Sequence, residues 1–152
     1  MFYQIKTVLL LGLLSGLMLA IGVLLGGNQG LIIGLVFALI INVGSYFFSS
    51  KLVLLMYRAK EADPGQYQDL HQIVEEVARR AGIPKPKIYI VSTPIANAFA
   101  TGRNPKNASL AVTKGLLDNL SDEEIEAVIS HEVAHVKNRD ILVATMAAVI
   151  AG

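Results

Sequence analysis

The sequence predicts an integral membrane α-helical hairpin followed by a small α+β domain that is incomplete at its C-terminus. Apolar residues make up 53% of the 152 residues, and the mean hydropathy is +0.54, which is high for a soluble domain. The charge is unevenly spread, because Lys6 is the only charged side chain between Met1 and Ser50 and the first acidic residue is Glu61. Amphipathic helix and strand patterns begin only after that point. We therefore expect the two halves to lie in different solvents.

Two uncharged runs are each long enough to cross a bilayer. They cover residues 7–25 and 31–50, and a helix that rises about 1.5 Å per residue needs about 20 residues to cross the hydrocarbon core. The glycine-rich segment 26–30 predicts a turn between them. A cleaved signal peptide is the alternative for the first run, but this run exceeds the usual apolar region and a second follows at once. We predict a transmembrane hairpin over residues 1–58.

Basic residues flank the two runs and predict their orientation. Lys6 precedes the first run, Lys51, Arg58 and Lys60 follow the second, and the turn carries no charge. By the positive-inside rule, both ends of the hairpin are cytoplasmic. We expect a multi-pass protein of the cell (inner or plasma) membrane with a cytoplasmic domain over residues 59–140.

Glycines recur four residues apart within the first run. Gly12 with Gly16, and Gly22 with Gly26, either allow helix backbones to approach closely or reflect the ordinary enrichment of glycine in membrane helices. The pattern alone leaves both interpretations open.

Composition excludes some kinds of partner and chemistry. A formal net charge of +1 without clusters of Lys and Arg argues against a nucleic-acid partner. The absence of cysteine excludes disulfides and cysteine nucleophiles. It is compatible with a reducing compartment but does not establish one.

The cytoplasmic part begins with an amphipathic helix and three strand patterns. Apolar residues recur at helical spacing up to a stop at Gly82, at Leu70, Ile73, Val74, Val77 and Ala81. Residues 87–91, 97–101 and 109–113 are short runs with strand character, and a polar loop over 102–107 separates the last two. We predict a small sheet.

A second helix carries the most informative motif. Ser121 followed by Asp122, Glu123 and Glu124 predicts a capping box at its start. The helix then passes through apolar positions, and we expect His131 and His135 to continue this buried flank toward a cleft floor. The apolar positions are Ile125, Val128 and Ile129.

The motif is His131-Glu132-Val133-Ala134-His135. On a helix, residues four apart have Cβ atoms about 5–6 Å apart, so both imidazoles can reach one ion. Zinc lowers the pKa of a bound water to about 7, and Glu132 can accept the proton as the water attacks a carbonyl. The pattern predicts a zinc site for amide hydrolysis, and a chance pattern on a solvated helix is the alternative.

Three further segments extend the likeness beyond the motif. They are residues 97–102, residues 113–117, and residues 126–130 leading into the motif and on to Asn138 and Asp140. With the hairpin, they resemble the HtpX family of membrane-embedded heat-shock zinc metalloproteases, which are related to the CAAX prenyl proteases. The resemblance implies a zincin-like domain of the gluzincin type and an endopeptidase for misfolded or damaged membrane proteins, active in stress response and protein quality control.

The resemblance also implies roles for single residues. His131 and His135 would bind one Zn²⁺ per complete active site, and Glu132 would be the general base. Asp140 would hold a ligand histidine in its correct tautomer, unless it merely closes the helix at the membrane boundary. An edge strand beside the cleft would receive an extended polypeptide substrate, although an internal structural strand is the alternative; this segment comprises Asn97, Ala98, Phe99 and Ala100. His71 is expected to be solvated.

The chain departs from the family at its end. The family takes a third ligand, a glutamate, from a helix downstream of the motif, whereas this sequence stops at Gly152. Residues 141–152 are apolar but too short to span alone, and we interpret them as the start of a third transmembrane helix that is cut off. Because a catalytic zinc normally has three protein ligands, we expect a truncated chain that is inactive on its own.

Two other functions remain open from the sequence. One is a prenyl-protein (CAAX) protease, which uses the same chemistry. Comparing the cleavage of prenylated peptides with that of plain peptides would distinguish it from a general endopeptidase. A catalytically inactive fragment or membrane scaffold would bind no stoichiometric zinc. The expected partners are polypeptide substrates and the lipid bilayer, while the cleavage preference and the oligomeric state are not encoded in any recognisable pattern.

Overall fold

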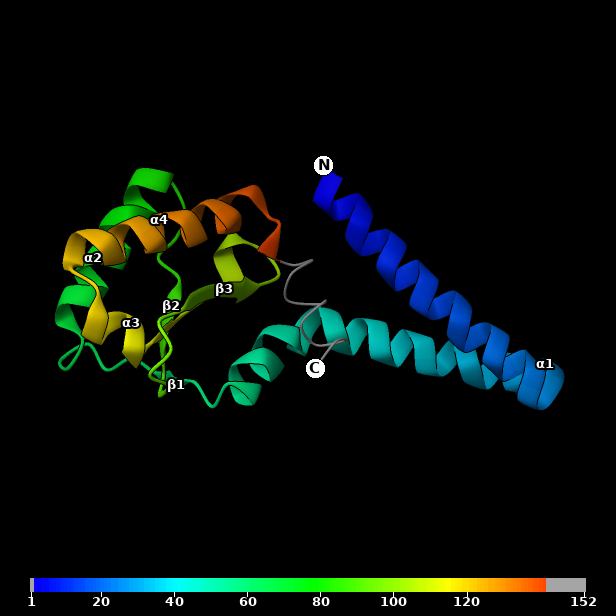
Figure 1. Cartoon of the computed structure of the whole chain (residues 1–152). Coiled ribbons are helices and arrows are strands. Elements are labelled where there is room, and N and C mark those ends of the chain that lie inside the picture. The colour runs from blue at the N-terminus through cyan, green and yellow to red at the C-terminus, as the bar shows by residue number, and fades with distance from the viewer. Residues whose placement is uncertain (1, 142–152) are drawn as a thin grey trace. The chain divides into compact units, whose positions relative to one another are not determined.

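The computed structural model describes residues 2–141. The chain forms two compact units, residues 1–49 and 50–152, both drawn in Figure 1. The last turns of the first helix belong to the second unit by their packing, since Leu54 is buried beside Val91 and Ala111. The hairpin over residues 1–58 and the cytoplasmic domain over residues 59–140 stay predictions. The predicted third span lies, apart from Ile141, outside the described residues.

The first helix, α1 (Phe2–Met56), is interrupted in its middle. Its backbone leaves the helical region at Gly26 (φ −145°, ψ 16°) and at Gly27 (φ 55°, ψ −135°). A positive φ is readily adopted by glycine, which has no Cβ. The glycine-rich segment therefore marks the place where α1 changes direction and divides into two arms (Figure 1).

The two arms of α1 contact each other through glycines and one polar pair. A Cβ added at Gly22 would collide with the carbonyl oxygen of Gly30, and one at Gly34 would lie 2.8 Å from the carbonyl oxygen of Met18. Such close backbone approach is typical of packed apolar helices. Gly12 does not take part in this contact, because a Cβ added there would have no other atom within 4 Å.

The polar pair lies between residues far apart in the sequence. The side-chain amide of Asn42 donates to Ser15 Oγ at 2.6 Å, while Ser15 Oγ donates to the Leu11 carbonyl at 2.7 Å. The stretch Leu11–Gly44 has a mean hydropathy of 2.1. By length and composition, α1 contains one helical stretch that is long and apolar enough to cross a membrane.

The second unit contains a four-stranded mixed sheet in the order β1-β2-β4-β3. β2 and β4 are parallel, and the two outer pairs are antiparallel. The strands are β1 (Lys60–Glu61), β2 (Lys87–Val91), β3 (Ala98–Gly102) and β4 (Ala108–Thr113). The three strands expected from the sequence are present within about one residue, and only the two-residue β1 was not anticipated.

Among the residues that the structure describes after α1, three α-helices and one short 3₁₀ turn accompany the sheet. They are α2 (Gln68–Ala81), η1 (Pro105–Asn107), α3 (Lys114–Asn119) and α4 (Asp122–Asn138). α2 ends at Gly82, which has φ 71° and donates to the last carbonyls of the helix. α4 begins with the predicted capping box between Ser121 and Glu124. Local sequence signals therefore set both helix ends.

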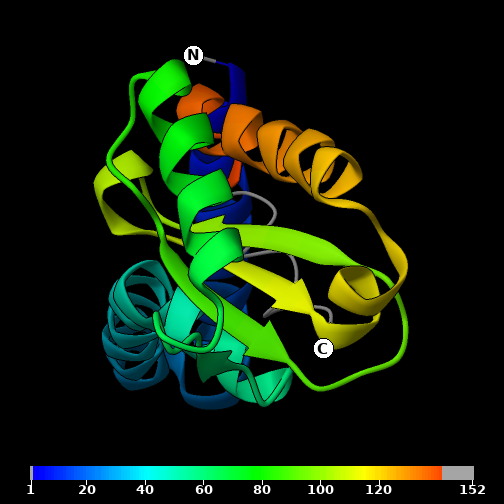
Figure 2. The ribbon, with the colours of Figure 1, turned by 90° about the vertical axis from the view of Figure 1, so that its left-hand side faces the viewer.

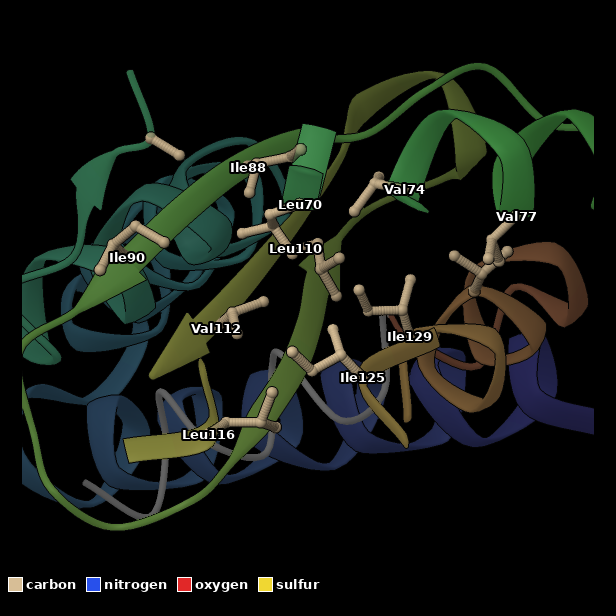
Figure 3. Close-up of a cluster of buried hydrophobic side chains, with 12 residues drawn as sticks. Leu70, Val74, Val77, Ile88, Ile90, Leu110, Val112, Leu116, Ile125 and Ile129 are labelled. Carbon is tan, nitrogen blue, oxygen red and sulfur yellow. The ribbon is translucent and has the colours of Figure 1, made fainter. Parts of the chain in front are cut away.

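α2 and α4 cover one face of the sheet (Figure 2). Side chains from both helices and from β2 and β4 interlock there, as Figure 3 shows. The most deeply buried include Leu110 at 1% exposure and Ile129 at 0%. The cluster comprises Ala62, Leu70, Val74, Val77, Ile88, Ile90, Leu110, Val112, Leu116, Ile125, Ile129 and Val133.

Thr113 joins three elements at the end of β4. Its Oγ1 accepts from the amides of Leu116 at 3.2 Å and Asn97 at 2.9 Å, and donates to the Asn97 carbonyl at 2.9 Å. It thereby caps α3 and fixes the start of β3. Thr113 itself is 3% exposed, so its hydroxyl group is shielded from water and depends on these bonds.

Replacing Gly30 by Ala should separate the arms of α1, because the added Cβ would collide with the Gly22 backbone. In a chain carrying cysteines at positions 15 and 42, oxidative cross-linking in detergent should fall by at least about half. Gly12→Ala is the matched control, since its Cβ would meet nothing within 4 Å, and it should cross-link as the parent does. Equal cross-linking in both variants would contradict this packing.

Replacing Thr113 by Val should lower the free energy of unfolding by about 2 kcal/mol, because three buried hydrogen bonds lose their partner. Urea denaturation monitored by circular dichroism measures the loss. Thr93→Val serves as a comparison, since Thr93 Oγ1 makes one long bond of 3.4 Å to Ile95 N, and it should lose clearly less stability. A Thr113→Val variant as stable as the parent would be inconsistent with this role.

Candidate active site

α4 presents the motif residues beside its buried flank. The side chains that enter the core are spaced for one helix face, at Ile125, Ile129, Val133 and Val136. The expectation that the histidines continue this flank is wrong: His131 is exposed and His135 is half-buried. The reason is the 3.6-residue period, which turns positions 131 and 135 to the outward side of a helix whose positions 129 and 133 face the core.

The two imidazoles converge on one point. His131 Nε2 and His135 Nε2 lie 3.1 Å apart, and the ring planes are inclined at 85° with centroids 4.7 Å apart. Two nitrogens bound tetrahedrally to zinc, each at about 2.0–2.1 Å, would be about 3.3–3.4 Å apart. The donor atoms and their separation therefore fit a shared zinc ion.

Asp140 binds His135 at Nδ1, the ring nitrogen that does not face His131. His135 Nδ1–H donates to Asp140 Oδ2 at 2.9 Å, and this hydrogen bond raises the pKa of His135. Arg139, in the left-handed region with φ 60°, turns the chain so that Asp140 reaches back to the helix. With the proton held on Nδ1, the lone pair of Nε2 faces the other imidazole.

The second carboxylate oxygen of Asp140, Oδ1, makes no hydrogen bond with the described residues. This atom is also buried. Buried carboxylate oxygens are normally paired. This oxygen belongs to the same carboxyl group whose Oδ2 accepts from His135.

The side chain of Glu132 extends from α4 to the outer strand of the sheet. Its Oε2 accepts from the backbone N–H of Ala100 at 3.1 Å, and Ala100 belongs to β3, the outermost strand at that side of the sheet. Ala98 and Ala100 face the α4 side, where they pack with the core. Phe99 points to the opposite face, with its ring 4.8 Å from that of Tyr57. Asn97 is exposed and precedes the strand.

The described residues bring together two candidate metal ligands and not three. No group of three His, Cys, Asp or Glu residues that could hold an ion occurs between residues 2 and 141. His71 is separate from the site: it is half-buried rather than solvated, with Nε2 at 3.1 Å from the Ala62 carbonyl. The Ala100 contact with Glu132 had no signal in the sequence, because it depends on how β3 meets α4.

Comparison with known proteins identifies the family. Residues 64–151 match peptidase family M48. The chain belongs to this family. The resemblance to HtpX proteases expected from the motifs is also confirmed, because curated relatives with that name match nearly the whole chain.

Two of these relatives indicate how much of a whole protein the chain represents. The "Protease HtpX homolog" of Persephonella marina is 55% identical over 150 residues, which are 99% of this chain and 52% of that protein. The homologue from Pyrococcus abyssi is 51% identical over 148 residues, 97% of this chain and 51% of that protein. The chain therefore spans about half the length of the curated relatives it matches.

A solved structure shares the fold. The crystal structure of S. mikatae Ste24p aligns with a TM-score of 0.56 and 21% identity, covering 94% of this chain and 36% of that one. At this identity, the likeness concerns the fold alone. The order of a long apolar helix followed by a small α/β unit is consistent with this fold.

Replacing Asp140 by Asn should lower the pKa of His135 in the metal-free chain, because the hydrogen bond with the carboxylate is the main cause of its elevation. NMR titration of the histidine side chains measures the change, with His71 as an internal reference. A raised folded-state pKa stabilises the fold below the ordinary histidine pKa of about 6.5, and this contribution is lost as the pH rises through the folded value. The stability difference between the two proteins should therefore shrink on going from acid to alkaline pH; an unchanged His135 pKa would exclude this role.

Proposed function

We propose that the chain forms the membrane hairpin and the first part of the catalytic domain of a zinc-dependent endopeptidase. The observation that carries the proposal is the convergence of His131 Nε2 and His135 Nε2 at 3.1 Å, with Glu132 beside the outer strand. The names of the curated relatives support protease activity. The proposed reaction is hydrolysis of peptide bonds in misfolded or damaged membrane proteins.

His131 and His135 would hold the zinc ion, with a third protein donor from outside residues 2–141. When bound, zinc would lower the pKa of a water molecule and polarise the carbonyl of the scissile peptide. Asp140 would keep His135 in the tautomer whose Nε2 is available, through the 2.9 Å bond to Nδ1.

Glu132 would transfer a proton from the attacking water to the leaving amine nitrogen. With Oε2 held by the amide of Ala100, Oε1 is left to accept a proton from the attacking water. The same carboxyl group would then protonate the leaving amine nitrogen, which completes general base and general acid catalysis by one residue.

β3 would bind the substrate as an additional strand. It is the outer strand of the sheet, and recognition through backbone hydrogen bonds depends little on side-chain identity. An enzyme for damaged membrane proteins needs this tolerance, because its substrates share an extended backbone rather than a sequence. Asn97 would lie at the entrance to this strand, while Phe99 points away from it toward Tyr57.

The two arms of α1 would form a transmembrane hairpin, with spans at about residues 7–25 and 31–50. The apolar stretch Leu11–Gly44 supports this proposal, as do the glycine contacts between the arms. Lys6, Lys51 and Arg58 flank the two spans, so the positive-inside rule favours a cytoplasmic catalytic domain in a multi-pass protein of the cell membrane.

Replacing Glu132 by Gln in the complete protein should reduce cleavage of an unfolded membrane substrate by about 10²–10⁴-fold, because the proton acceptor is lost. The zinc content, measured by atomic absorption, should stay the same. Glu126→Gln is a matched control on the same helix, where Glu126 pairs with Arg80 instead of facing β3, and it should retain activity. Full activity of the Glu132→Gln protein would refute the proposed base.

A further inference from the structure

The backbone N–H of Ala100 makes an unusual contact for an outer strand. It donates to the side chain of Glu132 on another element, at 3.1 Å from Oε2. We propose that this N–H is the positioning group of Glu132, so that the strand offered to the substrate also sets the place of the base. The inference rests on the proposed function and assigns a backbone role to Ala100.

The register of the sheet explains why this N–H is available to Glu132. β3 pairs with β4 in antiparallel fashion, with Phe99 opposite Ala111 and Ala100 opposite Leu110. The Thr113 amide donates to the Asn97 carbonyl at 3.0 Å, so position 97 faces β4. Because backbone groups alternate along an antiparallel strand, positions 99 and 101 also face β4, and positions 98 and 100 point outward.

Both partners of this contact belong to rigid elements. The methyl group of Ala100 packs beside Ala108, Val136 and Ile141, and Val133, next to Glu132 in α4, is 1% exposed. A glutamate side chain rotates about several bonds, and one fixed oxygen removes much of this freedom. Side chains that act in catalysis need such support from neighbouring groups to hold a productive geometry.

The contact also predicts how a substrate would align. With the Ala100 N–H engaged by Glu132, an extended polypeptide added to β3 would pair through the N–H and C=O of Ala98 and through the C=O of Ala100. The peptide bond that is cut would then lie beside Ala100, next to the base. The position of cleavage along the bound strand would thus follow from one backbone hydrogen bond.

Amide hydrogen exchange in the full chain tests the contact without any activity. In the metal-free chain in detergent micelles, NMR would follow the amides of Phe99, Ala100 and Thr101 in the parent and in Glu132→Ala. We expect Ala100 to exchange at least about 10-fold faster in the variant, because a hydrogen bond to a charged acceptor is lost, while Phe99 and Thr101 are unaffected. Glu132→Gln, which keeps an acceptor, should lie between the two.

Two results would overturn the proposal. Ala100 exchange that is equal in all three proteins would mean that Glu132 does not hold this amide. Faster exchange of Phe99, Ala100 and Thr101 together would mean that Glu132 merely stabilises the strand. Because zinc and turnover are not involved, this experiment remains decisive even if Glu132→Gln should prove active and the proposed function should fail.

Kinetics of the complete protein test the consequence for catalysis. Proline is tolerated in outer strands where the N–H points outward, so Ala100→Pro removes the donor and should lower kcat by about 10- to 100-fold with little change in KM. Ala100→Gly keeps the N–H and should restore most of this loss. Ala98→Pro removes an outward N–H that Glu132 does not use, and should act mainly on KM. An unchanged kcat in a folded Ala100→Pro protein would overturn the positioning role, and if this variant does not fold, the exchange result decides.

Discussion

The burial of one flank of α4 against the sheet is the constraint on which the site depends. Ile129 is 0% exposed and Val133 is 1% exposed, so the helix has a single rotational setting over β3 and β4. That setting leaves His131 and His135 on the outward side, where their Nε2 atoms lie 3.1 Å from each other. A different rotation of α4 would bury the imidazoles or separate Glu132 from the outer strand.

Hydrogen bonds to neighbouring groups hold two of the site residues on this helix in place. On one side, the carboxylate of Asp140 orients His135; on the other, the backbone of Ala100 holds Glu132. Thr113 fixes the first residue before β3 through its bonds to Asn97. Each group is held by a rigid neighbour, so the geometry for catalysis would exist before a substrate binds.

The sequence was informative where structure depends on neighbouring residues. The capping box at Ser121, the stop at Gly82 and the strand over residues 87–91 follow from local chemistry, and the structure contains all three. Two features that were missed depend on packing between distant segments: the short strand β1 and the contact of Glu132 with Ala100. The outward position of the histidines follows instead from the helical period, so the spacing of Ile129, His131 and His135 already contained it. The glycine pattern was ambiguous because only contact between the arms distinguishes Gly22 from Gly12.

In the proposed enzyme, one turn of α4 presents two imidazoles to a shared zinc ion. Titration of the chain with zinc, followed by NMR of the ¹⁵N-labelled histidine side chains, tests it most directly, because the chain has three histidines. If both imidazoles bind one ion, the Nε2 resonances of His131 and His135 will change together with the same zinc dependence, while those of His71 will not. A response of only one of the two, or of His71 instead, would contradict it.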